Sequence, residues 1–212
     1  MRLYNYFRSG TSHRTRIALN LKGLSYEYIP VNLRAGEDRS DRYLALNPQG
    51  LVPLLELEEC RLMQSPAIIE FLEERWPDPP LLPSDIFGRA RVRALAAMIG
   101  CDIHPINNLR ILNELRGSFG ADDAAVKGWC GKWITAGFEA IEQLLDEEPR
   151  RGRFCYGDSP TVADIYLVPQ IYSARRFEVD LASFPNIVEI DKACGELDAF
   201  RTATPAMQPD AA

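Results

Sequence analysis

The chain has 212 residues and a formal net charge of −6, with 24 Lys and Arg residues against 30 Asp and Glu residues. This length is enough for one or two compact domains with buried cores. The basic residues are dispersed along the chain and do not form the positive cluster typical of nucleic-acid-binding proteins, so we expect no nucleic-acid partner. The sequence has neither the pattern of a secretory signal nor a continuous apolar run of about 18 residues, so we expect a cytoplasmic protein that is not embedded in a membrane.

Strand and helix patterns alternate along the first eighty residues. Apolar and β-branched runs predict strands, and a helical run that ends at Gly23 separates the first two of them. A strand–helix–strand crossover joins parallel strands, whereas two later strands separated by a short turn form a hairpin. The pattern predicts a thioredoxin-like α/β domain with a mixed four-stranded sheet. Its expected strands are 3–7, 26–32, 51–57 and 61–64, and its expected helices are 14–22, 41–46 and 66–75.

A proline-rich segment marks the end of this domain. Residues 76–85 contain four prolines in ten positions, which is incompatible with a continuing helix and indicates a linker. We predict a thioredoxin-like domain over residues 1–78, a linker over 79–85 and an all-α domain over 86–212. The expected helices of the second domain are 88–117, 122–148, 162–176 and 187–200.

Two details of the second domain follow from local sequence. Thr161 and Asp164 have the spacing of a capping box, which gives both residues a structural role at the start of a helix. Residues 203–212 show no apolar periodicity, and we expect them to be loosely held.

The cysteines and histidines exclude some kinds of chemistry. The five cysteines are odd in number, widely spaced and never arranged as C-x-x-C, so we interpret them as small buried residues rather than as disulfides or a redox centre. The chain has only two histidines, His13 and His104, without clustered Cys or Asp partners. A zinc site is therefore not expected. Any catalysis should use an organic cofactor or side chains alone.

Several local motifs accompany this domain plan. The first is the segment Phe7-Arg8-Ser9-Gly10-Thr11-Ser12-His13-Arg14, and the others are Leu46-Asn47-Pro48, Val52-Pro53, Gln64-Ser65 and the stretch from Cys101 to Arg110. Together they resemble the zeta class of the glutathione transferase family over essentially the whole chain. The resemblance implies the glutathione transferase fold, glutathione as cofactor and a homodimer.

The active-site segment departs from the zeta-class pattern. Where the class has serine, serine and cysteine, this chain has Ser9, Gly10 and Thr11. The run from Ser9 to Arg14 is closer to the bacterial branch that isomerises maleylpyruvate, as is the stretch from Cys194 to Phe200. The resemblance therefore implies a glutathione-dependent cis–trans isomerase that converts maleylpyruvate to fumarylpyruvate in gentisate-type aromatic catabolism.

Such a reaction requires that a carbon–carbon double bond become a single bond for long enough to rotate. A thiolate that adds to the conjugated system and then leaves achieves this, so glutathione would act as a true cofactor. Ser9 and Thr11 lie where the first helix begins, and hydroxyls and free N–H groups at that place lower the pKa of a thiol. We expect Ser9 to be the leading thiolate partner and Thr11 the second. The alternative is that both residues only cap the helix.

The resemblance also assigns the rest of the cofactor site. Gln64 and Ser65 would hold the γ-glutamyl carboxylate at the start of a helix, although Ser65 by itself has the pattern of a simple N-cap. Val52, which precedes the family's cis-proline at Pro53, would offer its backbone to the cysteinyl part of the peptide.

A dicarboxylate substrate requires cations with a suitable geometry, and arginine supplies a rigid fork for a carboxylate. Arg8, beside Ser9, is the first candidate, and Arg110 and Arg176 could contribute from the helical domain. For Arg14 and Arg16 a solvated or salt-bridged role is an equal alternative.

The two histidines have different expectations. His13 lies within the first helix and is expected to face solvent or to pack locally. His104, with Asn108 one helical turn later on the same face, could bond glutathione or substrate, or it could be a satisfied structural residue. The resemblance suggests in addition that Asp102 reaches glutathione across a dimer interface.

Two other kinds of function are open. Maleylacetoacetate isomerisation and general glutathione conjugation use the same cofactor site and differ in the substrate cavity. A non-catalytic glutathione transferase-like binding module is the other alternative, but such modules tend to lose the polar active-site groups that this chain retains.

Overall fold

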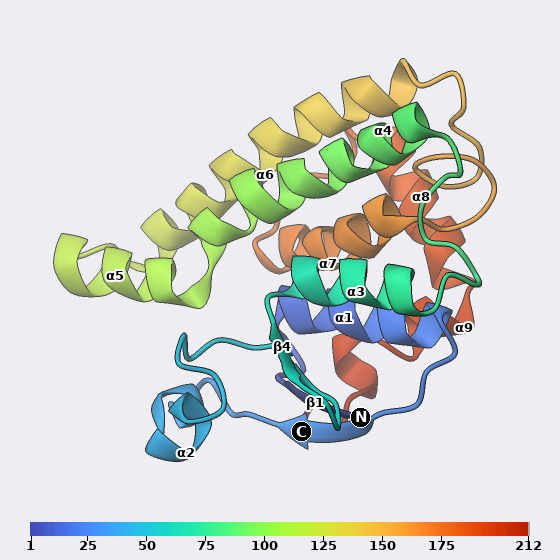
Figure 1. Cartoon of the computed structure of the whole chain (residues 1–212). Coiled ribbons are helices and arrows are strands. Elements are labelled where there is room, and N and C mark those ends of the chain that lie inside the picture. The colour runs from blue at the N-terminus through green and yellow to red at the C-terminus, as the bar shows by residue number, and fades with distance from the viewer. Residues whose placement is uncertain (212) are drawn as a thin grey trace. The chain divides into compact units, whose positions relative to one another are not determined.

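In a computed structural model, which describes residues 1–211, the chain folds into two units (Figure 1). The first comprises Met1–Leu81 together with the segment that begins at Glu196, and the second comprises Leu82–Gly195. The boundaries expected from the sequence group residues 86–212 together. The two divisions therefore differ in where they assign the segment after Gly195.

The sheet of the first unit is mixed. Strand β1 (Arg2–Asn5) lies between β2 (Glu27–Pro30) and β3 (Leu54–Glu56), and β4 (Arg61–Met63) completes the order β2-β1-β3-β4. Strands β1 and β2 are parallel because a helix returns the chain between them, whereas the β1–β3 and β3–β4 pairs are antiparallel. The prediction of a thioredoxin-like, mixed four-stranded sheet is confirmed.

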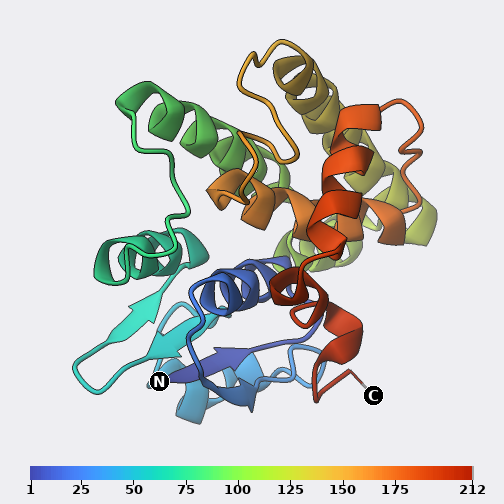
Figure 2. The same ribbon diagram turned by 90° about the vertical axis from the view of Figure 1, so that its right-hand side faces the viewer.

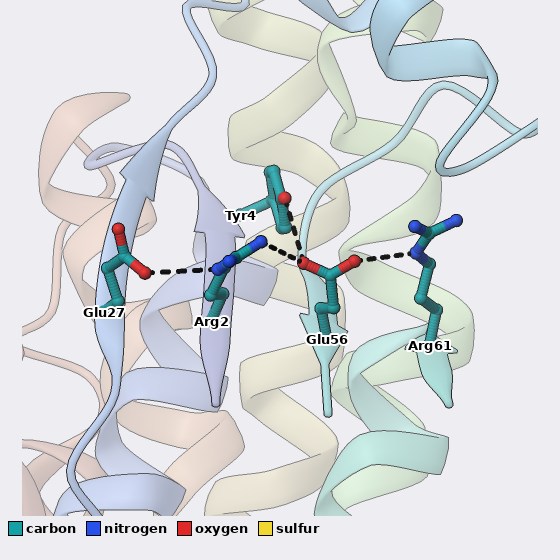
Figure 3. Close-up of polar contacts among 5 residues, drawn as sticks. All are labelled: Arg2, Tyr4, Glu27, Glu56 and Arg61. Atoms are coloured by element: carbon teal, nitrogen blue, oxygen red, sulfur yellow. Dashed lines mark hydrogen bonds and ion pairs between the residues drawn. The ribbon is translucent and has the colours of Figure 1, made fainter. Parts of the chain in front are cut away.

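A row of alternating charges crosses all four strands (Figure 3). Arg2 pairs with Glu27 at 3.2 Å and with Glu56 at 3.1 Å, and Glu56 pairs with Arg61 at 2.9 Å. The hydrogen bond from Arg61 is the main cause that lowers the pKa of Glu56, with a further contribution from the Tyr4 hydroxyl at 3.1 Å. Exposed pairs contribute at most about 1 kcal/mol each. Opposite charges at facing positions nevertheless favour this register over a slipped one.

Helices α1 (Gly10–Leu21) and α3 (Ser65–Arg75) pack together on one face of this sheet (Figures 1 and 2), and α2 (Asp41–Leu44) is a single turn. The core between these helices and the sheet is aliphatic, and burial of each such side chain contributes about 1.5–3 kcal/mol. Its fully buried members include Leu3, Ile17, Leu55, Ile68 and Leu72.

The chain after Gly195 packs on the first unit. Helix α9 (Asp198–Arg201) lies beside α1, where Figure 2 shows it in red. Ala203 is fully buried, and Nε2 of Gln208 donates to the carbonyls of Thr202 and Thr204 at 2.8 Å each. The expectation of a loosely held tail is wrong for residues 203–211, because backbone and side-chain hydrogen bonds hold the segment without any apolar periodicity. Residue 212, the last position of that expectation, lies outside the described residues.

The second unit is helical, as predicted. Its long helices are α4 (Ile86–Ala97), α5 (Leu109–Phe119), α6 (Asp123–Asp146), α7 (Val162–Arg176) and α8 (Pro185–Gly195). Helix α7 packs against α4 and α8 and is buried over most of its length. Within residues 1–211 no helix is both long enough and apolar enough to cross a bilayer.

Two of the expected long helices are interrupted. The expected helix 88–117 is divided into α4, a π-helix (Met98–Ile103), a 3-10 turn (Pro105–Asn107) and α5. Pro105 has no N–H to continue the ladder, and its ring clashes with the carbonyl that an α-helix would place four residues earlier. The N–H of His104 bonds to the carbonyl of Ile99, five residues back, at 2.9 Å. The expected helix 187–200 is likewise divided into α8 and α9 at Gly195.

The capping box at the start of α7 is confirmed. The carboxylate of Asp164 accepts the N–H of Thr161 at 2.7 Å and its hydroxyl at 2.8 Å. It also accepts the N–H of Cys155 at 2.9 Å, so it fixes the preceding loop as well. Burial raises the pKa of Asp164, and these hydrogen bonds oppose that rise.

Candidate active site

The start of α1 holds a chain of hydroxyl groups. Ser9 is the N-cap, and its Oγ accepts the N–H of Ser12 at 3.2 Å. The hydroxyl oxygens of Ser9 and Thr11 lie 2.9 Å apart, and the Thr11 hydroxyl donates to the carbonyl of Val52 at 3.0 Å. Because a hydroxyl has one hydrogen and that of Thr11 is committed to Val52, the hydrogen between the two oxygens belongs to Ser9. Ser9 therefore both caps α1 and forms a hydrogen bond with the Thr11 hydroxyl.

Val52 is held by the loop before it. The Val52–Pro53 peptide bond is cis, as the resemblance implied. The preceding carbonyl, that of Leu51, accepts the hydroxyl of Tyr43 and Nδ2 of Asn47, each at 2.7 Å. These bonds explain the Leu46-Asn47-Pro48 motif, since the Asn47 amide fixes the approach to the cis-proline. Burial raises the pKa of Tyr43, so its hydroxyl remains a donor at neutral pH.

A small apolar cluster supports the same loops. Tyr6, Val31, Tyr43 and Val52 are buried together, and Phe7 packs against them. The rings of Tyr6 and Phe7 meet edge to face at 4.8 Å between centroids. This cluster therefore packs against the loop between β1 and α1, while Ser9 and Thr11 at the end of the loop remain partly accessible.

The start of α3 combines an uncommon backbone conformation with a buried, unpartnered hydroxyl. Gln64, which precedes the helix, has a positive φ of 69°, an uncommon and costly conformation for a non-glycine residue. No side chain caps this helix within residues 1–211, although Ser9 caps α1 and Asn108 caps α5. The Ser65 side chain is 1% exposed, and its hydroxyl has no hydrogen-bond partner among the described residues. Buried hydroxyls without partners are uncommon and call for a ligand or a water.

Arg8 is free to bind an anion. Its guanidinium carbon stands 5.9 Å from the centroid of the Phe7 ring. In the part of the chain that the structure describes, no carboxylate pairs with it. This cation lies next to Ser9, as expected from the sequence, and it differs in its surroundings from the two arginines of α1.

The polar residues inside α1 are buried, which excludes the solvated alternatives expected for His13, Arg14 and Arg16. Arg14 and Arg16 are 1% and 0% exposed, and His13 is 2% exposed, so none of them is solvated. Arg16 donates to the carbonyls of Phe7 and Ala203 at 3.0 Å each, and to Oδ1 of Asn5 at 2.9 Å. Burial, with the charges of Arg16 and Arg14, lowers the pKa of His13, which is therefore neutral at pH 7. Arg16 is a structural residue that holds the loop between β1 and α1 through the carbonyl of Phe7.

The candidates of the second unit lie in two places. Asp102 is exposed near the end of the π-helix, and His104 follows that helix. Asn108 caps α5 by accepting the N–H of Arg110 at 3.1 Å. His104 and Asn108 therefore do not share one face of a continuous helix, contrary to expectation. The exposed side chain of Arg110 lies in the first turn of α5, and the exposed Arg176 ends α7 with its guanidinium 5.5 Å from the Phe177 ring.

Sequence reasoning missed two supports of the first unit. Tyr43 and Asn47 fix the loop before Val52, and Asp210 accepts the N–H of Phe7 at 3.1 Å. The Leu46-Asn47-Pro48 motif was a signal for the first support. No local pattern around Asp210 indicated the second.

Comparison with known proteins agrees with this geometry. Residues 8–75, which include Ser9, Thr11, Val52 and Ser65, match the family model "Glutathione S-transferase, N-terminal domain". A maleylpyruvate isomerase of Ralstonia sp is 64% identical over 212 residues, which is all of both chains. The chain belongs to the glutathione transferase family.

Other members show that the chain belongs to the zeta class of this family. It is 52% identical over 213 residues to a maleylacetoacetate isomerase of Pseudomonas aeruginosa, covering 99% of this chain and 98% of the relative. A solved holo structure, described as a maleylpyruvate isomerase and a bacterial zeta-class glutathione transferase, superposes with a TM-score of 0.99 at 64% identity over all of both chains. A maleylacetoacetate isomerase structure from Methylobacterium extorquens, with bound malonate and GSH, has a TM-score of 0.97 at 36% identity over all of both chains.

Proposed function

We propose that this protein isomerises maleylpyruvate to fumarylpyruvate with glutathione as its cofactor. The 64% identity to a maleylpyruvate isomerase over the full length of both chains carries the choice of reaction. The malonate and GSH in the Methylobacterium extorquens relative support a site for a small dicarboxylate beside glutathione. The residues of the first unit provide the chemical reason.

The start of α3 fits the γ-glutamyl carboxylate of glutathione. The buried hydroxyl of Ser65 lacks a hydrogen-bond partner among the described residues, and the side chain of Gln64 does not cap the helix. A carboxylate is the acceptor that a helix N-terminus favours. Gln64, whose backbone turns the chain into the helix, and Ser65 would therefore hold this end of the cofactor.

The cysteinyl part of glutathione fits between Val52 and the start of α1. The cis-proline turns the chain at Val52, whose backbone would pair with the extended peptide. The carbonyl of Val52 already accepts the Thr11 hydroxyl at 3.0 Å and retains a second lone pair for a ligand N–H.

Bound glutathione supplies a thiolate that can add to the conjugated double bond and leave again after rotation. Ser9 would stabilise this thiolate by turning its hydroxyl hydrogen away from Thr11 and towards the sulfur. Before glutathione binds, Thr11 orients the Ser9 side chain through the 2.9 Å hydrogen bond between their hydroxyls. The N–H groups at the start of α1 add a positive partial charge, which lowers the thiol pKa further.

Arg8 would bind a substrate carboxylate. It follows Phe7 and precedes Ser9, and its side chain has no counterion in the described residues. A carboxylate can therefore accept two parallel N–H bonds from its guanidinium. We propose Arg110 and Arg176 as further substrate contacts, and Asp102, His104 and Asn108 as further glutathione contacts. Their support is the resemblance, together with the exposure of Asp102, Arg110 and Arg176 and the partial exposure of His104 and Asn108.

Maleylacetoacetate isomerisation is the second candidate, because a relative that is 52% identical carries that name. The two reactions use the same cofactor and differ in the substrate beyond the shared diacid. General conjugation of glutathione and a purely binding role are less well supported, since the paired hydroxyls and Arg8 serve a reaction on an anionic substrate. We also propose a homodimer in the cytoplasm, which size-exclusion chromatography with light scattering and cell fractionation would test.

The decisive experiment compares initial rates on maleylpyruvate and maleylacetoacetate, each with and without glutathione. We expect a higher kcat/KM for maleylpyruvate and no measurable rate without glutathione. A higher kcat/KM for maleylacetoacetate would support the second candidate. A rate that is independent of glutathione would overturn the cofactor and the mechanism together.

A further inference from the structure

Both backbone polar groups of Phe7 are held by side chains from other segments of the chain. The N–H of Phe7 donates to Oδ2 of Asp210 at 3.1 Å, and its carbonyl accepts Nη2 of Arg16 at 3.0 Å. Asp210 belongs to the tail and Arg16 to α1. The loop that leads into Arg8 and Ser9 is therefore clamped from two directions.

The tail, here the segment from Glu196 to residue 211, is fixed to α1 and β2 at several points. Asn20 of α1 donates to the carbonyl of Ala199 at 3.0 Å and to the Thr202 hydroxyl at 3.1 Å. Nε of Arg16 donates to the carbonyl of Ala203 at 3.0 Å. The second oxygen of Asp210 accepts the hydroxyl of Tyr28 on β2. Asp210 thus joins the tail, an edge strand and the active-site loop.

The clamp acts close to the proposed chemistry. Phe7 precedes Arg8 directly, and its ring lies 5.9 Å from the Arg8 guanidinium carbon. The N–H of Ser9 donates to the carbonyl of Tyr6 at 3.0 Å, which closes a turn around Phe7 and Arg8. A displacement of the Phe7 backbone therefore also displaces Ser9. A misplacement of about 1 Å remote from the reacting atoms can reduce a rate by up to about 100-fold.

We propose that Asp210 is a positioning residue, which fixes the loop so that Ser9 faces the cofactor thiol and Arg8 faces the substrate. This inference rests on the proposed function, because it concerns the same site. It adds that the tail, which contains none of the expected site residues, determines the precision of that site. The γ-glutamyl cradle at Gln64 and Ser65 has no bond to Asp210 and is not affected.

The experiment compares Asp210→Ala and Asp210→Asn with a matched tail variant, Asp198→Asn. Asp198 is an exposed carboxylate of the same tail that forms an ion pair with Arg201, so it tests general loosening of the segment. A second matched variant, Tyr28→Phe, removes the other partner of Asp210 and leaves its bond to Phe7. All variants are measured as the full chain.

Three readouts are used. Hydrogen–deuterium exchange without ligand should rise in the peptide that contains Phe7 for Asp210→Ala. The pKa of the glutathione thiol, followed in the binary complex by the ultraviolet absorbance of the thiolate, should rise as well. The kcat on maleylpyruvate should fall about tenfold, while the KM for glutathione changes by less than about twofold. Asp210→Asn, which retains one acceptor oxygen, should lie between Asp210→Ala and the wild type.

The results separate this inference from the proposed function. If exchange rises but the thiol pKa and kcat stay at the wild-type values, or if Asp198→Asn gives the same losses, Asp210 only anchors the tail and the inference is overturned. If the wild type binds glutathione without isomerising maleylpyruvate, the proposed reaction fails, whereas the thiol pKa still tests Asp210. A wild type that binds no glutathione would overturn both.

Discussion

The hydroxyl oxygens of Ser9 and Thr11 lie 2.9 Å apart, and the hydrogen between them comes from Ser9. Thr11 directs its own hydrogen to the carbonyl of Val52, beside the cis-proline. The Ser9 hydroxyl can thus rotate towards a bound sulfur, and the hydrogen bond to Thr11 orients the Ser9 side chain before the sulfur binds. The replacement of the zeta-class Ser-Cys pair by Gly10 and Thr11 preserves a second polar group at this place.

Ser9→Ala should lower kcat and raise the pH at which kcat/KM is half-maximal. Without the Ser9 hydroxyl the thiol pKa rises, so the thiolate forms only at higher pH. Loss of the N-cap should also cost about 1 kcal/mol of stability. Ser9→Gly separates the two effects, because glycine at an N-cap costs only a few tenths of a kcal/mol. Equal losses of kcat in both variants, measured over a pH series, would assign the loss to chemistry; a normal kcat in Ser9→Gly would assign it to the cap.

Ser65→Ala should stabilise the free protein and weaken glutathione binding. The buried Ser65 hydroxyl has no partner among the described residues, and removal of such a group recovers about 1–3 kcal/mol of desolvation cost. The same change should raise the Kd for glutathione about tenfold, since a hydrogen bond to a carboxylate is lost. Calorimetric titration and chemical denaturation measure the two effects.

Ser12→Ala is the matched control for Ser65→Ala. Ser12 is also fully buried, but its hydroxyl oxygen accepts the N–H of Tyr6 at 3.4 Å. It should lose stability and retain the wild-type Kd. An unchanged Kd for glutathione in Ser65→Ala would remove Ser65 from the cofactor site.

Arg8→Ala should damage substrate handling and spare the cofactor. We expect kcat/KM for maleylpyruvate to fall about 100-fold, because a bidentate contact to a carboxylate is lost, with less than about a twofold change in the Kd for glutathione. Arg8→Lys should recover only part of the loss, since a lysine lacks the fork. The exposed Arg2→Ala serves as the control for loss of one positive charge. A Kd that rises with an unchanged kcat/KM would place Arg8 in the cofactor site instead.

Lys22→Met should destabilise the protein strongly without touching the site. Nζ of Lys22 lies 2.6 Å from Oε2 of Glu73 and 2.7 Å from the carbonyl of Pro79, and its side chain is 0% exposed. The same carboxylate oxygen accepts the N–H of Leu81 at 2.9 Å. An unpaired buried Glu73 should cost about 3–5 kcal/mol in denaturant unfolding.

The double variant Lys22→Met/Glu73→Leu should recover part of that loss, because it removes the isolated charge. Arg61→Gln is the control in the same unit, as its pair with Glu56 is exposed and should change stability by less than about 1 kcal/mol. A loss in Lys22→Met no larger than in this control would show that the Lys22–Glu73 pair does not hold the linker.

The candidate site of the first unit was predicted from two sources. Local patterns placed Ser9 and Ser65 at helix starts and Val52 before a proline, whereas the resemblance to the zeta class assigned their roles towards glutathione. The helix break at His104 could not be placed in this way. Pro105 signalled an interruption, but the π-helix before it packs against α4, α6 and α7, and no local pattern predicted that helix.

By itself, the sequence determined the order of strands and helices, the mixed sheet, the capping box of α7 and the segment that contains Arg8, Ser9 and Thr11. Side-chain periodicity and the restricted backbone of proline act over a few residues, so they can be recognised without the fold. Only the tertiary structure decided that Arg16 is buried and that the tail is fixed. The partners that satisfy these polar groups, Ala203 for Arg16 and Asp210 for Phe7, lie 187 and 203 positions away along the chain. Whether a charged or polar group is solvated or buried depends on such distant partners, and no local pattern records them.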